Sequence, residues 1–125
     1  MTGFRTASDR GRIAEDAVAA RFAQAGYRIL ARNYAVHAMG ELDLVVQLGT
    51  CLSVVEVKAR YRAQAFGGAA AALTPAKMKR IRKATLHFQQ NHQYMNNELR
   101  LLAALVELDS TGAVVSIQIV PIEWR

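Results

Sequence analysis

The chain has one cysteine, Cys51, so no intrachain disulfide can hold its fold together. It also lacks a Cys/His cluster with zinc-ligand spacing, a Ser/His/Asp or Cys/His arrangement, and a phosphate-binding glycine loop. No apolar run approaches the ~18 residues that a membrane-spanning helix needs. The N-terminal residues are polar and basic, unlike a secretion signal. We therefore expect a cytoplasmic protein without membrane contacts, whose fold depends on its hydrophobic core.

Acidic residues are also scarce, because 10 Asp and Glu stand against 16 Lys and Arg, for a net charge of +6. Hydrophobic residues make up 52% of the 125 residues, which is typical of a globular protein. We expect a flexible N-terminus over residues 1–9 and a single domain over residues 10–125. The positive charge favours a nucleic acid as partner, although ribosomal RNA or an anionic membrane surface would fit the charge equally well.

Hydrophobic periodicity predicts the order helix, three strands, helix, two strands. The first helix is expected over residues 10–25, with Asp9 as its N-cap and Gly26 after its end. The second is expected over residues 75–91, because Thr74-Pro75 is typical of a cap and first turn. This order predicts an α/β fold with one mixed β-sheet of about five strands flanked by helices. The strands are expected at residues 27–34, 41–47, 52–59, 99–108 and 114–120.

The second and third strands form a predicted hairpin that carries several charged residues. Gly49-Thr50 suits a two-residue type II′ turn, which requires glycine first. In the register set by this turn, Asp43 lies opposite Glu56. Glu41 lies opposite Lys58, and all four side chains share one face. Directly opposed residues have Cβ atoms ~4.5–5.5 Å apart, where like charges are destabilising.

Two opposed carboxylates in an otherwise apolar hairpin predict a metal site. A divalent cation would remove the repulsion between Asp43 and Glu56, and Mg²⁺ or Mn²⁺ favours such oxygen ligands. The Val57 carbonyl is a further expected ligand, Lys58 would hold water or steady charge on a phosphate, and Glu41 would position water. The alternative is an exposed edge hairpin in which Glu56 and Lys58 form a surface pair, worth ~0–1 kcal/mol.

A second charged cluster lies at the start of the second helix, where five cations fall within seven residues. Like charges three or four positions apart destabilise a helix, and contacts with nucleic-acid phosphates would relieve that repulsion. The alternative is that the cluster serves solubility alone. No base-reading motif is present, so any specificity should concern nucleic-acid structure. The expected nucleic-acid contacts are Lys77, Lys79, Arg80, Arg82 and Lys83, extended by Arg12 and Arg60. Residues 60–73, just beyond Lys58, are interpreted as a loop that contacts the substrate.

Taken together, these motifs resemble the YraN-like family of uncharacterised bacterial proteins. More widely, they resemble the restriction-endonuclease-like superfamily, which includes archaeal Holliday-junction resolvases. The resemblance covers most of the chain. The matching features are Ala14-Glu15, Gly26-Tyr27-Arg28-Ile29-Leu30, Arg32-Asn33-Tyr34, Gly40-Glu41-Leu42-Asp43-Leu44, Val55-Glu56-Val57-Lys58-Ala59-Arg60, Phe66-Gly67 and Lys77.

The resemblance implies a restriction-endonuclease-like fold and a metal-dependent endonuclease that acts on DNA, either branched or single-stranded. It also implies that Glu15, a solvated helix residue by its spacing alone, helps to bind the metal and takes part in catalysis. Resolvase-like relatives act as dimers, so a homodimer is expected.

Two departures from the family pattern stand out, Ala14 in place of a glycine and Leu102 in place of an aspartate. Two alternatives stay open, the first of them because of the lost acid. One is a nucleic-acid-binding protein with the same fold and little or no turnover, and the other is an RNA- or ribosome-associated factor.

Overall fold

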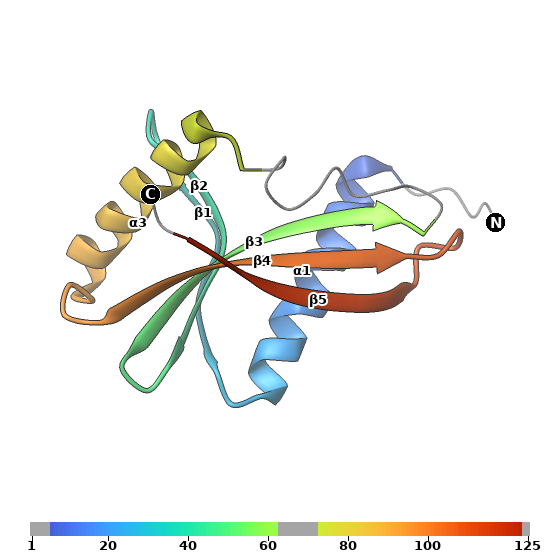
Figure 1. The fold of residues 1–125 in the computed structure, drawn as a ribbon, viewed down its shortest axis with the longest axis horizontal. Helices are drawn as coiled ribbons and strands as arrows, with labels where there is room; N and C mark the ends of the chain where they lie inside the picture. The colour runs from blue at the N-terminus through green and yellow to red at the C-terminus, as the bar shows by residue number, and fades with distance from the viewer. Residues whose placement is uncertain (1–5, 63–72, 124–125) are drawn as a thin grey trace.

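The computed structural model describes residues 6–62 and 73–123, in which helices and strands follow the predicted order (Figure 1). Every strand end lies within two residues of its predicted position. The predicted α/β class and element order are therefore confirmed. The elements are α1 (Ala7–Gln24), β1 (Arg28–Val36), β2 (Gly40–Leu48), β3 (Cys51–Tyr61), α3 (Pro75–His92), β4 (Glu98–Leu108) and β5 (Val114–Ile122).

One mixed sheet holds the five strands in the order β1-β2-β3-β4-β5. Strands β3 and β4 are parallel, and the other neighbours are antiparallel. A parallel pair needs a crossover connection, and here that connection includes α3. Pro121 lies in the edge strand β5, where its missing N–H leaves no interior bond unmade.

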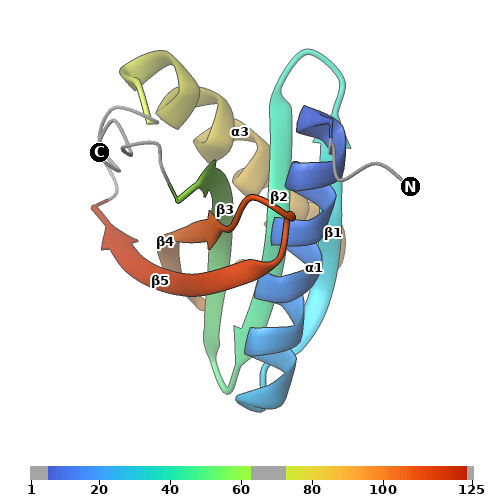
Figure 2. The ribbon, with the colours of Figure 1, turned by 90° about the vertical axis from the view of Figure 1, so that its right-hand side faces the viewer.

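The two helices pack on opposite faces of the sheet, as Figure 2 shows. On the α1 side, Val18 and Phe22 pack with Val46 and Val55 of the hairpin. Burying a Val, Leu or Phe side chain contributes about 1.5–3 kcal/mol, so this packing fixes the hairpin between two layers. The exposed-edge alternative is therefore wrong, because β2 and β3 are interior strands. On the α3 side, the buried cluster is Leu42, Val45, Leu52, Val54, Ile81, Ala84, Phe88 and Leu101.

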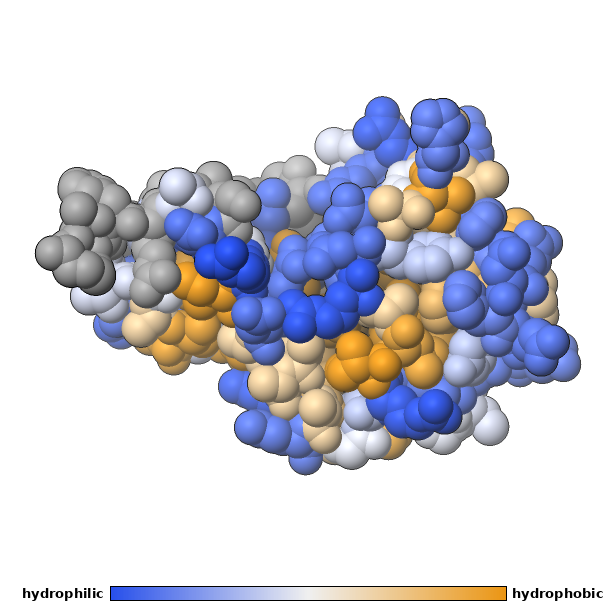
Figure 3. Space-filling model, turned by 180° about the vertical axis from the view of Figure 1, so that it is seen from behind, coloured by the Kyte–Doolittle hydropathy of each residue, from blue (hydrophilic) through white to orange (hydrophobic). Residues whose placement is uncertain are grey.

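Neither helix, nor any other helix in the described ranges, is long and apolar enough to cross a membrane. Figure 3 shows the α1 side of the molecule, where hydrophilic side chains frame several apolar patches.

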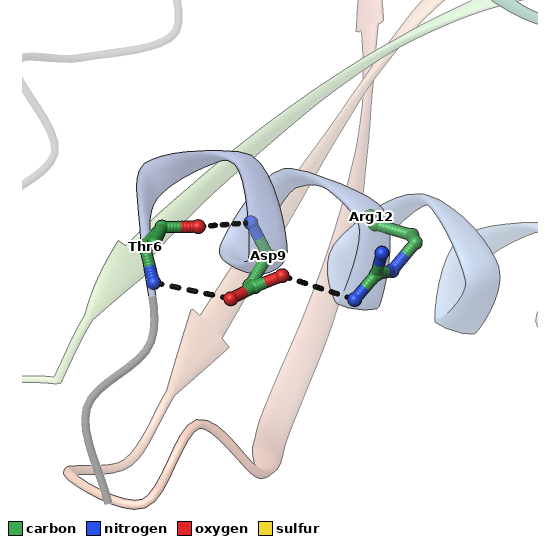
Figure 4. A network of polar contacts seen from close by, with 3 residues as sticks. All are labelled: Thr6, Asp9 and Arg12. Atoms are coloured by element: carbon green, nitrogen blue, oxygen red, sulfur yellow. Dashed lines mark hydrogen bonds and ion pairs between the residues drawn. The ribbon is translucent and has the colours of Figure 1, made fainter.

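Helix α1 begins at Ala7, three residues earlier than predicted, and its N-cap is Thr6 and not Asp9 (Figure 4). The Thr6 hydroxyl accepts the Asp9 N–H at 3.0 Å, and the Asp9 carboxylate accepts the Thr6 N–H at 3.3 Å. This reciprocal capping box satisfies two N–H groups that the helix leaves unpaired. Residues 6–9, expected in a flexible N-terminus, therefore belong to the capped start of α1. Residues 1–5 lie outside the described residues.

The hairpin register is confirmed where the two strands pair, from Leu48 opposite Cys51 to Leu44 opposite Val55. Gly49 has φ 59°, and Thr50 has no positive φ, as a type II′ turn requires. The backbone pairing of β2 with β3 ends at Leu44 and Val55. Beyond that point the strands diverge in Figure 1, and β2 continues toward the first turns of α3.

Candidate active site

Asp43 and Glu56, here termed the acidic pair, meet at the point where β2 and β3 stop pairing. The Val57 N–H donates a hydrogen bond to Asp43 Oδ2 at 2.8 Å. In return, the Asp43 N–H donates to Glu56 Oε2 at 3.4 Å. Each carboxylate thus accepts an N–H of the opposite strand. These two hydrogen bonds replace the missing backbone pairing. They also hold the two carboxylates in place.

The predicted repulsion between the two acids is present. Glu56 is only 6% exposed, and this burial raises its pKa to about 8, with the charge of Asp43 as the second cause. Burial also raises the pKa of Asp43, against the hydrogen bond from Val57 and the positive charge of Lys77, which lower it. A second full negative charge in the pair is therefore costly until a cation compensates it.

The donor set of the acidic pair fits a hard divalent cation. The hydrogen bonds of the described residues engage Oδ2 of Asp43 and Oε2 of Glu56, while Oδ1 and Oε1 take no part in them. Mg²⁺ binds through one or two carboxylates plus water and phosphate oxygens, so two such ligands suffice. In the described parts of the chain, no three Asp, Glu, His or Cys side chains are close enough to share an ion. The Val57 carbonyl as a further ligand stays a prediction.

Glu15 and Glu41 lie around the acidic pair without joining it. Glu15 is hydrogen-bonded to Asn33, and its pKa is raised by burial and then by the charge of Asp43. Glu41 is exposed, and its charge helps to raise the pKa of both Glu15 and Glu56. The four acids that the sequence analysis predicted for the site therefore lie in one region.

The predicted opposition of Glu41 and Lys58 does not form, because β2 and β3 have separated before they reach it. The ion pairs within 4.0 Å among the described residues include no Glu41–Lys58 contact. Lys58 instead borders a small hollow together with Glu56 and Lys77. Its charge lowers the pKa of Asp43, as a lysine beside the acids should.

An open pocket of about 560 Å³ lies over the acidic pair, between β2 and the first turns of α3. Asp43 and the buried Glu56 both line this pocket, so a ligand in it would approach the pair from this side. The residues that line it are Gly40, Glu41, Asp43, Glu56, Thr74, Ala76, Lys77, Arg80 and Ile81.

The five cations of α3 are exposed, but they do not form one surface. Lys77 and Arg80 border the acidic pocket. Arg82 and Lys83 border a separate apolar groove with Leu86 and Leu99. Lys79 borders neither of these hollows. The predicted cationic cluster is thus divided by the turn of the helix.

The other two predicted nucleic-acid contacts are engaged in ion pairs. Arg60 is bound to Glu107 at 3.1 Å and is 22% exposed. Arg12 is bound to Asp9 at 3.0 Å on α1 (Figure 4). Helix α1 lies across the sheet from α3. The structure therefore does not join these arginines to the α3 cations. Nucleic-acid contact by any of the seven stays a prediction.

The aspartate that the family pattern has and this chain lacks would not lie on the face of Glu56. Leu102 packs into the α1-side cluster opposite Val55, whereas Ala103 is the residue opposite Glu56. Neighbouring residues of a strand point to opposite faces, so an aspartate at this position would face α1.

Sequence reasoning missed the part that Asn33 and Lys77 play beside the acids, although it named Lys77 as a nucleic-acid contact. Asn33 has φ 51° in the middle of β1 and binds Glu15, and Lys77 acts on the acidic pair from α3. Both were visible as matches to the family pattern, which was the available signal. The expected substrate loop falls largely on residues 63–72, Phe66-Gly67 included, and these lie outside the described residues.

The comparisons with known proteins all point to one family. The model of the uncharacterised protein family UPF0102 matches residues 14–109. A UPF0102 protein of Neisseria meningitidis serogroup C is 38% identical over 98 residues, which cover 78% of this chain and 84% of the relative. A UPF0102 protein of Frankia casuarinae is 39% identical over 104 residues, covering 83% of this chain and 86% of the relative. The YraN-like resemblance is thereby confirmed, and the chain belongs to the uncharacterised protein family UPF0102.

Proposed function

We propose that this protein is a metal-dependent endonuclease that hydrolyses phosphodiester bonds of DNA in the cytoplasm, on branched or single-stranded forms. The observation that carries the proposal is the acidic pair, two opposed carboxylates held by each other's strand inside a two-sided core. A fold gains no stability from such a pair, because burial and mutual repulsion both disfavour its charge. The resemblance to the restriction-endonuclease-like superfamily supplies the reaction class.

The acidic pair would hold Mg²⁺ or Mn²⁺, and Glu15 would help to bind the ion, as the family resemblance implies. When bound, such an ion polarises a phosphate and makes a bound water acidic. Lys58 would stabilise the negative charge that develops on the phosphate. Glu41, which is exposed at the pocket, would orient the attacking water by accepting a hydrogen bond. The cations of α3 would attract the DNA backbone.

The test is a cleavage screen with Mg²⁺ or Mn²⁺ on linear, flapped, four-way and single-stranded DNA, and on an RNA of the same sequence. Asp43→Ala and Lys58→Ala should each lower the cleavage rate by on the order of a hundred- to a thousandfold, with folding retained. Glu98→Ala removes a carboxylate away from the acidic pair and should leave cleavage unchanged. Lys79→Ala removes a predicted DNA contact outside the pocket and should lower cleavage only slightly. Cleavage that survives both Asp43→Ala and Lys58→Ala would refute the assignment.

A second function is favoured by a specific observation, the absence of a third acid or histidine at ion-sharing distance in the described residues. It is a nucleic-acid-binding protein with this fold and little or no turnover. Its signature would be DNA binding that weakens steeply with salt, with no product in any metal. Stronger binding to the RNA would instead favour an RNA-associated role.

The mass of the protein in solution would test the expected homodimer.

A further inference from the structure

The pocket over the acidic pair has two walls of opposite charge. One wall is formed by Glu41, Asp43 and Glu56 of the hairpin. The other is formed by Lys77 and Arg80, from the first two turns of α3. A ligand that fills such a pocket should itself carry both signs of charge. A divalent cation together with a phosphodiester meets that requirement.

Lys77 occupies a central place between these walls. It borders the main pocket and also the smaller hollow that contains Glu56 and Lys58. Its backbone N–H donates to the Thr74 hydroxyl at 3.2 Å, so the N-cap fixes the turn from which its side chain extends. The backbone position of Lys77 at the edge of the pocket is therefore set by the helix start.

Lys77 acts on the acids without touching them. Its charge lowers the pKa of both Asp43 and Glu56, and for Asp43 it outweighs Lys58. No ion pair within 4.0 Å joins Lys77 to either carboxylate among the described residues. The ammonium and the carboxylates thus face each other across the pocket, with space between them.

We propose that Lys77 positions a DNA phosphate across the pocket from the acidic pair, and that it opposes cation binding while no phosphate is present. This role rests on the proposed function of the pair as a metal site. It makes cation and DNA mutually dependent, because the phosphate would neutralise the charge that repels the ion. A residue that merely stabilised the fold would not couple the two ligands.

The chain provides a matched control for this role in Lys79. It lies two residues further along the same helix, is equally charged and exposed, and borders neither the acidic pocket nor the smaller hollow. Any difference between Lys77→Ala and Lys79→Ala therefore reports position and not net charge. Lys77→Arg keeps the charge in place and serves as the rescue variant.

The experiment titrates Mn²⁺ alone into the wild type and these three variants by calorimetry. A unit charge lying a few ångströms from a dication changes its affinity on the order of tenfold. We therefore expect Lys77→Ala to bind Mn²⁺ about tenfold more tightly, whereas Lys79→Ala and Lys77→Arg stay close to the wild type. Circular dichroism confirms that each variant is folded.

The second measurement is fluorescence anisotropy of a labelled short DNA duplex, in EDTA and in Ca²⁺, an ion that also prefers oxygen ligands. Addition of Ca²⁺ should strengthen DNA binding by the wild type, and Lys77→Ala should lose most of that gain, on the order of tenfold. Lys79→Ala should keep the gain and lose only a small, metal-independent part of its affinity.

The outcomes separate the two proposals. If the wild type binds Mn²⁺ and Lys77→Ala matches Lys79→Ala in both measurements, the role of Lys77 is wrong and the metal site stands. If neither the wild type nor Lys77→Ala binds Mn²⁺, the proposed function fails and the role of Lys77 fails with it. Loss of the tighter Mn²⁺ binding in an Asp43→Asn, Lys77→Ala double variant would confirm that the acidic pair holds the ion.

Discussion

The two ends of the β2–β3 hairpin differ in the hydrogen bonds that hold the strands together. At the closed end, five residue pairs from Leu48–Cys51 to Leu44–Val55 keep regular backbone pairing around the turn. At the open end, the strands part and the carboxylates of Asp43 and Glu56 take the N–H groups of the opposite strand. One pair of strands thus carries an apolar core at one end and a buried charged site at the other.

The difference lies in what satisfies each buried group. Apolar side chains at the closed end need only packing, and both helices supply it. Charged side chains at the open end need hydrogen bonds or counter-charges, because a buried polar group without a partner is costly. The divergence of the strands provides backbone N–H groups that a regular sheet would have used. We therefore expect substitutions at the two ends to have different consequences.

The largest effect should come from placing an acid at the closed end. Val54 is fully buried on the same face as Glu56, two residues earlier in β3. Val54→Glu would bury a carboxylate where the backbone N–H groups are already paired, at a cost of about 4 kcal/mol or more. We expect the domain to unfold at neutral pH, as seen by circular dichroism. A folded variant with wild-type urea resistance would contradict the proposed difference between the two ends.

An effect that leaves the domain folded should follow from removing the charge at the open end. Glu56 titrates near its ordinary pKa in the unfolded chain and at about 8 in the folded protein. Between these values the unfolded state has lost a proton that the folded state keeps, so wild-type stability falls as pH rises from about 4.5 to about 8. Glu56→Gln should remove most of this fall, on the order of 1.4 kcal/mol for each pKa unit.

Urea unfolding at pH 5 and pH 8 measures this difference. The variant should gain on the wild type at pH 8 and differ little from it at pH 5. Glu98→Gln, at an exposed glutamate of β4, should leave the pH dependence as it is in the wild type. If the stability of Glu56→Gln fell between pH 5 and pH 8 as much as that of the wild type, burial of the Glu56 charge would not be the cause of the fall.

The smallest effect should distinguish the glycines at the two ends. Gly49 has φ 59°, and a Cβ added there would meet open space, so Gly49→Ala should cost only the backbone strain of about 1 kcal/mol. Gly40 has φ 153°, and a Cβ there would lie 3.0 Å from Arg80 Cβ and 3.2 Å from its carbonyl oxygen. Gly40→Ala should therefore cost more, because α3 must also move. Equal urea midpoints for the two variants would contradict this order.

Much of the fold could be predicted because local signals agreed with one another. Gly49-Thr50 fixed the register of the hairpin, and apolar runs marked the interior strands. The start of α1 was misjudged because aspartate and threonine are both good caps, and only the geometry shows that Asp9 completes a box begun by Thr6. The bulge between Ile29 and Ala31 leaves no comparable trace in the sequence.

The candidate site was predicted as a set of residues but not as an arrangement. The hairpin register derived from the sequence predicted that Asp43 and Glu56 lie together. It could not show that the strands part at this point, which separates Glu41 from Lys58. Nor could it show that Lys77 faces the acids, because the approach of α3 to β2 is a tertiary contact between distant segments.

The hydrogen bond from Val57 to Asp43 has a practical consequence. An amide proton that is bound to a carboxylate changes its NMR frequency when that carboxylate gains a proton or a ligand. The Val57 amide is therefore a built-in reporter of Asp43, and the Asp43 amide is one of Glu56. In a nitrogen-15 spectrum, the occupancy of the site could be followed at two backbone signals, with no substrate present.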